Sequence, residues 1–273
     1  DDGRQIYTVF HPNKITYTYP GNNEGNLFYA FSKRLVHDTI VPESIPDPCL
    51  VVKLNDTLSI NLMCVEGGTF TMGKGENAHE VTLSDYYMSE CELTQAQWEA
   101  VMGSNPSKFK GDNLPVDNVS WNDCQKFVEK LNSLTKDSRP SGMVFRLPTE
   151  AEWEYSARGG SKSRGHKYSG SSNIDNVAWY DGNSSSKTHE VATKLPNELG
   201  LYDMSGNVWE WCSDWYGRYN LSEEGNPQGT PIGKERVARG GSWFVAAKSC
   251  RVAYRNSCDP NKRYTDFGFR LAQ

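Results

Sequence analysis

The sequence lacks several features that would assign it at once to a common class of protein. No run of apolar residues approaches the roughly 20 that a membrane-spanning helix requires, so we predict no such segment. The seven cysteines include no Cys-x-x-Cys pair, which argues against a zinc knuckle, and their odd number leaves at least one thiol unpaired. The five histidines show neither the spacing of a metal-binding pair nor a place in a Ser/His/Asp arrangement, so a conventional hydrolase is not supported.

The sequence also lacks an excess of positive charge. Its formal net charge is −5 and its pI is near 5.6, and no stripe of Lys and Arg stands out, so we do not expect nucleic acid as a partner. The N-terminus has no basic segment followed by an apolar one, which is the pattern of a signal peptide. Because the chain opens abruptly with Asp1-Asp2-Gly3, we expect that a leader has been removed.

Aromatic residues and glycine are abundant. The 8 Trp, 14 Tyr and 24 Gly, with a mean hydropathy of −0.68, predict a core of large amphipathic rings joined by many turns. Residues 1–55 are interpreted as an N-terminal extension, either strands or an extended arm, with a Pro-rich linker at 41–48. Residues 56–273 are expected to form the main domain, in which the region after Gly159 consists of polar loops and short strands.

Three short helices are predicted from their N-terminal caps. Thr94 is followed three residues later by Gln97, which is the spacing of a capping box. Thr149 and Glu152 repeat that spacing. Ser120 precedes an apolar stripe at helical spacing, made by Trp121, Cys124, Phe127, Val128 and Leu131.

The most informative segment is Leu201–Trp211. Its two acidic residues, Asp203 and Glu210, are separated by Gly and Asn residues that permit a tight turn, so they can converge on one hard cation such as calcium. The same spacing leaves an alternative open, in which Asp203 caps a turn and Glu210 pairs with an arginine. Near the C-terminus, Arg270 is interpreted as a structural residue whose guanidinium ties the last strand to loop carboxylates or carbonyls.

A resemblance to a known family rests on seven blocks that occur in order: Val65–Gly73, Glu92–Thr94, Pro115–Trp121, Arg146–Glu154, Gly206–Trp211, Arg239–Trp243 and Gly268–Arg270. Together they resemble the formylglycine-generating enzyme, or sulfatase-modifying factor, family over about residues 60–273. The resemblance implies an α+β, C-type-lectin-like fold with a small mixed β-sheet, few short helices and extensive calcium-stabilised loops. It also implies an extracytoplasmic location, which is periplasmic, secreted or at the cell surface in bacterial members.

The resemblance further implies two calcium sites. The first takes four ligands, the middle two through their carbonyls: Asp203, Gly206, Val208 and Glu210. The second falls near Asn176, the Val177 carbonyl, Asn183 and the Ser185 carbonyl. Asn183 stands where the enzyme carries an Asp, and the loss of one negative charge should weaken that second site.

The catalytic positions depart from the family. In the enzyme, two cysteines five positions apart hold copper(I), which activates oxygen to convert a sulfatase cysteine to formylglycine. Cys250 matches the second cysteine, whereas Val245 occupies the place of the first and offers copper no lone pair. Cys258 stays open as a replacement ligand or disulfide partner, although we favour Cys250 as a small buried thiol. Ser242 and Trp209 match positions that line the substrate and oxygen pocket, or they serve as a turn hydroxyl and a core indole.

Two functions follow. The favoured hypothesis is a non-catalytic, calcium-stabilised domain that binds a protein or glycan ligand or acts in cell-envelope assembly, since loops rich in Tyr, Trp, Asn and Ser suit recognition. The alternative is a copper-dependent oxidase that converts a sulfatase cysteine to formylglycine, against which Val245 speaks. A sulfoxide-synthase activity would require an additional iron-binding domain that residues 1–55 are too few to supply.

Overall fold

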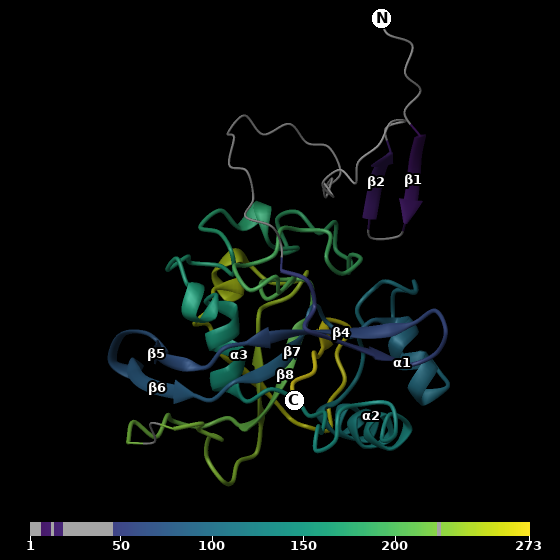
Figure 1. Cartoon of the computed structure of the whole chain (residues 1–273). Coiled ribbons are helices and arrows are strands. Elements are labelled where there is room, and N and C mark those ends of the chain that lie inside the picture. The colour runs from purple at the N-terminus through teal and green to yellow at the C-terminus, as the bar shows by residue number, and fades with distance from the viewer. Residues whose placement is uncertain (1–6, 12–13, 19–45, 223–224) are drawn as a thin grey trace, which may run out of the picture. The chain divides into compact units, whose positions relative to one another are not determined.

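The computed structural model describes residues 7–11, 14–18, 46–222 and 225–273 (Figure 1). The chain divides into two compact units, Asp1–Glu43 and Ser44–Gln273. In the first unit, strands β1 (Tyr7–His11) and β2 (Lys14–Thr18) pair in antiparallel register. Of the expected N-terminal arm, residues 1–6, 12–13 and 19–45 lie outside the described residues, and residues 46–55 belong to the second unit. The division falls inside the Pro-rich stretch 41–48, whereas the boundary at residue 55 stays a prediction.

The second unit contains three small sheets rather than one large one. A three-stranded antiparallel sheet has the order β3 (Leu50–Lys53), β4 (Ser59–Val65) and β7 (Tyr86–Ser89). A hairpin pairs β5 (Gly68–Met72) with β6 (His79–Leu83). A four-stranded sheet has the order β10 (Asn256–Cys258), β9 (Arg236–Arg239), β8 (Trp209–Trp215) and β11 (Phe267–Gly268). Because β11 runs parallel to β8 while β9 runs antiparallel to it, this last sheet is mixed, as predicted.

The three predicted helices are confirmed, together with their caps. They are α1 (Gln95–Met102), α2 (Trp121–Leu134) and α3 (Glu150–Ala157). At each start the cap side chain accepts the amide of the third helical residue, whose own side chain accepts the cap amide. Short 3-10 turns interrupt the loops at Gly75–Asn77, Gly160–Lys162, Ile174–Asn176 and Ala247–Cys250. Among the described residues, no helix has both the length and the apolar character needed to cross a membrane.

Aromatic rings fill the core between the helices and the mixed sheet. Trp98 of α1 stacks on Phe127 of α2 with ring centroids 5.3 Å apart, and Phe269 meets Phe127 edge-on at 5.5 Å. Burial of side chains of this size stabilises the fold by roughly 2–3 kcal/mol each. The polar N–H groups of buried rings pair with backbone carbonyls. Trp211 Nε1, for example, donates to the Val119 carbonyl at 3.1 Å.

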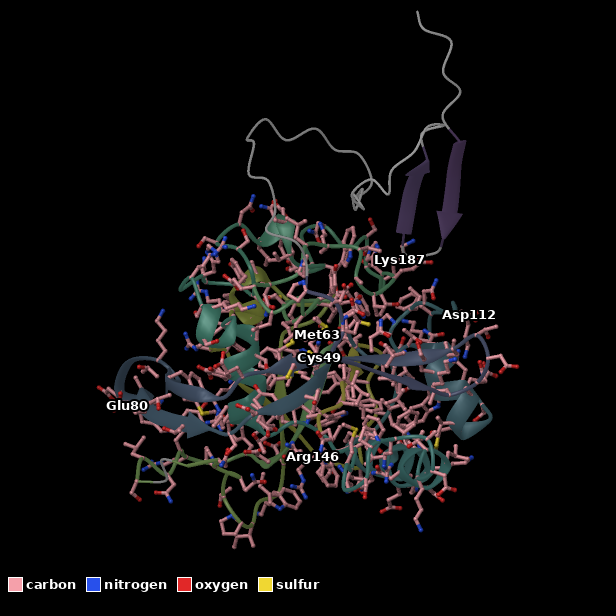
Figure 2. All side chains as sticks on the ribbon, in the orientation of Figure 1. Cys49, Met63, Glu80, Asp112, Arg146 and Lys187 are labelled. Atoms are coloured by element: carbon pink, nitrogen blue, oxygen red, sulfur yellow. The ribbon has the colours of Figure 1, made fainter. Side chains whose placement is uncertain are left out.

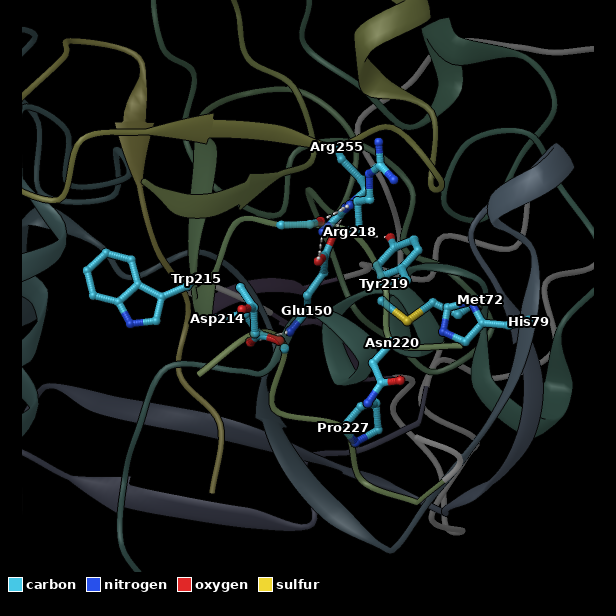
Figure 3. Close-up of a pocket in the computed structure, with 13 residues that line it drawn as sticks. Met72, His79, Glu150, Asp214, Trp215, Arg218, Tyr219, Asn220, Pro227 and Arg255 are labelled. Carbon is cyan, nitrogen blue, oxygen red and sulfur yellow. Dashed lines mark hydrogen bonds and ion pairs between the residues drawn. The ribbon is translucent and has the colours of Figure 1, made fainter. Parts of the chain in front are cut away.

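Helix α3 is buried on every side, although three of its residues are glutamates. Arg239 of β9 is itself fully buried and donates to Glu150 Oε1 at 3.0 Å and to Glu154 Oε2 at 2.6 Å. Arg255 also pairs with Glu150, through its Nη2 at 2.6 Å from Oε2 (Figure 3). These pairs compensate the cost of burying the carboxylates, and they tie α3 to the mixed sheet.

Asp214, by contrast, is a buried acid that forms no ion pair within the described part of the chain. It lies on β8 and lines the same small recess as Glu150, Tyr219 and Arg255 (Figure 3). Its Oδ2 accepts the Glu150 amide at 2.9 Å and the Ser213 hydroxyl at 3.0 Å. Burial, followed by the negative charge of Glu150, raises the pKa of Asp214 to about 7.

This raised pKa predicts a pH-dependent stability. Because the folded pKa lies above the unfolded value, the contribution of Asp214 is present at acid pH and is lost as the pH rises through about 7. Replacing Asp214 by Asn should reduce the loss of unfolding free energy between about pH 4 and 7 by up to roughly 1.4 kcal/mol per pH unit. Urea unfolding at several pH values measures this slope. The exposed Asp137→Asn variant serves as the control, and an unchanged slope in Asp214→Asn would contradict the assignment.

Candidate functional site

The turn that precedes β8 brings the predicted first set of site residues together. Asp203, Gly206 and Asn207 all have left-handed backbone conformations, with φ of 56°, 84° and 59°. A Cβ at Gly206 would lie 2.3 Å from the Trp179 carbonyl oxygen, so only glycine fits there. Two non-glycine residues held at positive φ carry a conformational cost that such a turn retains mainly at functional sites.

Glu210 is held by an arginine at the base of this turn. Both side chains are fully buried, and Arg270 donates from Nε to Glu210 Oε2 at 2.6 Å and from Nη2 to Oε1 at 2.8 Å. Trp153 of α3 adds its ring N–H to Glu210 Oε2 at 2.7 Å, and Arg270 also donates to the Tyr202 carbonyl. The alternative expected from spacing, a pairing of Glu210 with an arginine, is therefore present. The structural role expected for Arg270 is confirmed.

Glu92 completes the turn, although sequence reasoning assigned it no role. Its Oε1 accepts the amide of Val208 at 2.9 Å, and its Oε2 accepts the side-chain amide of Asn207 at 2.7 Å. The Asn207 side-chain oxygen in turn accepts the His189 amide at 3.0 Å. Glu92 stands in one of the blocks that carry the family resemblance, which was the available signal.

The turn carries more buried negative charge than its arginine neutralises. Among the described residues, Arg270 is the fully buried arginine near Glu92, Asp203 and Glu210, and Lys194 adds a further positive charge near Asp203. Burial raises the pKa of Asp203 to about 6, and burial followed by the charge of Asp203 raises the pKa of Glu92 well above its usual range. A proton or a bound cation would relieve this excess.

Of the oxygen atoms predicted to bind calcium, some accept no hydrogen bond from the described residues and could bind a cation, whereas others are already paired. Asp203 Oδ2 accepts the Ala192 amide at 2.7 Å, but the buried Oδ1 accepts no hydrogen bond from the described residues. Within the same part of the chain, no hydrogen bond ends on the carbonyl of Gly206 or Val208. Glu210 differs, since a cation would have to share it with Arg270. The described residues contain no cluster of three or more His, Cys, Asp or Glu side chains arranged around a metal position.

The second predicted set is largely occupied by internal hydrogen bonds. The Asn183 side-chain oxygen accepts the Tyr180 amide at 3.0 Å, and the Asn176 carbonyl accepts the Leu195 amide at 3.0 Å. The Val177 side chain packs in an apolar cluster, while Ser185 has a left-handed backbone with φ of 55°. The four residues therefore belong to one loop region, but the Asn183 side chain already has a structural partner.

Two of the predicted catalytic residues, Ser242 and Trp209, both hydrogen bond to Asp266. The Ser242 hydroxyl donates to Asp266 Oδ2 at 2.8 Å, and the Asp266 carbonyl accepts the amide of Trp209 at 2.8 Å. The Ser242 amide also hydrogen bonds to the Cys250 thiol. A Cβ at Gly241 would lie 2.6 Å from Cys250 Sγ, which shows how closely the preceding backbone packs on the sulfur. Sequence spacing could not identify Asp266, because it lies far along the chain from its partners.

Cys250 is buried in an apolar environment. It is 0% exposed and lies in a cluster with Tyr168 and Val177, against which the half-buried Val245 packs. Burial, followed by the nearby charge of Asp181, raises the pKa of Cys250 to about 12. The thiol is therefore protonated at neutral pH, and the residue in the family's other cysteine position is a hydrocarbon. These two residues do not fit copper(I), which requires a pair of thiolates.

Comparison with known proteins identifies the family of the chain. A family model described as the sulfatase-modifying factor enzyme 1-like domain matches residues 52–273. The chain belongs to the sulfatase-modifying factor family. Its α+β, C-type-lectin-like fold with few helices and mixed sheets is that of this family.

Relatives of this sulfatase-modifying factor domain carry different names. The chaperone protein LppX of Paenibacillus barcinonensis is 35% identical over 265 residues, covering 80% of this chain and 91% of the relative. The formylglycine-generating enzyme of Mus musculus is 35% identical over 193 residues, or 65% of this chain and 49% of the enzyme. This chain therefore spans about half the length of that enzyme. Among solved structures, Treponema denticola variable protein 1 has a TM-score of 0.75 at 34% identity, covering 82% of this chain and 98% of that one.

The Arg270–Glu210 pair of this family domain predicts a large effect of mutation. Arg270→Met leaves Glu210 buried without its partner and should cost about 3–5 kcal/mol of unfolding free energy. Adding Glu210→Gln to that variant should restore part of the loss, because the uncompensated charge disappears. Arg263→Met removes a pair to Asp123 in which the arginine side chain is 56% exposed, and it should cost under about 1 kcal/mol. Denaturant unfolding that gave equal costs for Arg270→Met and Arg263→Met would contradict this account.

Proposed function

We propose that this chain is a non-catalytic recognition domain that is stabilised by calcium, is located outside the cytoplasm, and acts in protein or glycan binding or in cell-envelope assembly. The observation that carries the proposal is the replacement of the metal-binding thiol pair by Val245 packed in the cluster around a buried Cys250. One thiol and an isopropyl group do not supply the two sulfur ligands that hold copper(I), so oxygen activation at this position would lack its metal.

The names of two similar proteins give a second, independent argument for a binding role. One relative that covers most of this chain is named a chaperone, and a solved structure of similar length is named a variable protein. Neither name denotes a catalyst. The match to formylglycine-generating enzymes supports the alternative, a copper-dependent oxidase acting on a sulfatase peptide, and the experiments below separate the two.

Three exposed aromatic rings lie on segments connected to the buried Ser242 and its partner Asp266, and they supply a candidate binding face. Phe244 is 68% exposed and contacts Trp243 with ring centroids 5.2 Å apart. Tyr254 lies against Trp209 at 6.1 Å, and Tyr264 against Phe267 at 5.3 Å. A ring that packs against a neighbouring ring on one side and faces solvent on the other loses little conformational entropy when it binds a ligand. Such rings suit recognition of a protein or glycan. We call Phe244, Tyr254 and Tyr264 the aromatic face.

Calcium is assigned to the turn before β8. Asp203 Oδ1 and the carbonyls of Gly206 and Val208 would supply oxygen ligands, and Glu210 would be shared with Arg270. The cation would offset the negative charge that Asp203 and Glu92 bring into the core. The second set, around Asn183, would bind more weakly because its amide is already engaged.

Copper(I) titration of the reduced protein tests whether the copper-binding cysteine pair of the family is absent. We expect no tight binding that depends on Cys250, so the wild type and Cys250→Ser should give the same titration. Val245→Cys should create binding that is lost again in the double variant with Cys250→Ser, while Val245→Ala should not. Tight binding by the wild type that Cys250→Ser abolishes would favour the oxidase.

Thermal unfolding with calcium or with a chelator tests the cation site. Saturating calcium should raise the Tm of the wild type by roughly 5–10 °C, the shift expected at about a hundredfold excess over Kd. Asp203→Ala should lose this shift. Asp117→Ala is the matched control, because Asp117 is also a buried acid with one unbonded oxygen but lies outside the turn. A full calcium shift in Asp203→Ala, or none in the wild type, would remove calcium from the proposal.

Binding assays test the aromatic face. A glycan array tests glycan ligands, and a light-scattering assay with reduced, unfolded lysozyme tests protein ligands. We expect binding to one of them, reduced at least tenfold by Phe244→Ala combined with Tyr254→Ala. Leu134→Ala, an exposed apolar residue on α2, should leave it unchanged. Equal binding by the two variants would exclude the aromatic face, and no binding to either probe by the wild type would argue against these ligand classes.

A further inference from the structure

Two cysteines that play no part in the family site lie together at the start of the second unit. Cys49 Sγ accepts the backbone amide of Cys64 at 3.2 Å, and the two side chains also hydrogen bond to each other. Both residues are exposed. Their sulfur atoms are therefore neighbours on the surface of the domain.

Regular strand geometry would have kept these sulfurs apart. In the β3–β4 pairing, Leu50 faces Leu62, so the next position would place Met63 opposite Cys49. Cys64 would then point to the other face of the sheet. Instead, a bend at Cys49, which is labelled in Figure 2, lets its amide donate to the Leu62 carbonyl at 3.0 Å, while its sulfur accepts the amide of Cys64.

The remaining cysteines differ from this pair in exposure. Cys124, Cys212 and Cys250 are buried, and Cys91 and Cys258 are only partly exposed. A dissolved oxidant therefore reaches Cys49 and Cys64 most easily. Their proximity then favours a bond between them over a bond to another molecule.

We propose that Cys49 and Cys64 form a reversible disulfide when a small disulfide such as oxidised glutathione is the oxidant. One protein thiolate attacks the oxidant and releases one glutathione thiol, leaving a mixed disulfide on the protein. The second protein thiolate attacks the protein sulfur of that mixed disulfide and releases the second glutathione. Two protein thiols are thereby oxidised, and the two electrons and two protons leave on two molecules of reduced glutathione.

The bond closes a loop over residues 49–64 and covalently fixes the first strand of the second unit. Residue 49 directly follows the Pro-rich stretch 41–48, so the disulfide secures the point at which the N-terminal segment joins β3. A loop of this length should raise the Tm by roughly 5–10 °C when the bond forms. Such a bond persists in an oxidising compartment, in keeping with the extracytoplasmic location proposed above.

A peptide map of the full chain tests the bond directly. Trypsin cleaves after Lys53, between the two cysteines, so a disulfide joins two otherwise separate peptides. After treatment with oxidised glutathione and blocking of free thiols, we expect a linked peptide pair containing Cys49 and Cys64. Reduction should separate the pair and lower the Tm by the amount above.

The variants make the outcome specific. Cys49→Ser and Cys64→Ser should each abolish the linked pair and the redox-dependent change in Tm, whereas Cys258→Ser should retain both. The proposal is overturned if Cys49 and Cys64 stay open to alkylation after oxidation. It is equally overturned if each carries glutathione without joining the other, or if Cys258→Ser removes the redox dependence instead.

Discussion

The buried pair between Arg270 and Glu210 is the interaction on which the rest of the second unit depends. It connects the C-terminal segment to β8, and further contacts extend it to the Tyr202 carbonyl and to the indole of Trp153 on α3. Arginine suits this position because its planar guanidinium can satisfy a carboxylate and two carbonyls at once. A domain with short strands and long loops has few backbone ladders, and such a pair holds its loops in one arrangement.

The pair also sets the electrostatics of the neighbouring turn. Arg270 forms its ion pair with Glu210, and burial raises the pKa of the neighbouring Asp203 and Glu92 despite the nearby guanidinium. The turn has a left-handed backbone at Asp203, Gly206 and Asn207, and Asp203 Oδ1 accepts no hydrogen bond from the described residues. Calcium is the partner we propose for this turn, and its binding would couple the stability of the loops to the ionic composition outside the cell.

Local sequence signals predicted local structure well. The caps at Thr94, Ser120 and Thr149 begin helices as expected, because a capping box depends only on residues three apart. Contacts between distant segments were not accessible in the same way. Asp266, the partner of Ser242, and Glu92, the partner of the turn before β8, are brought to their contacts only by the folded chain. The family resemblance gave the order of the blocks, but it gave neither of these contacts.

The central claim is that hydrophobic packing around Cys250 has replaced a metal-binding thiol pair, leaving a family fold that recognises ligands. The most direct measurement is incubation of the full chain with copper(I), oxygen and a cysteine-containing sulfatase peptide, followed by mass spectrometry of the peptide. The account predicts that the peptide cysteine stays unmodified and that oxygen uptake does not depend on the peptide. Conversion of that cysteine to an aldehyde by the wild type, lost in Cys250→Ser, would contradict it and establish an enzyme.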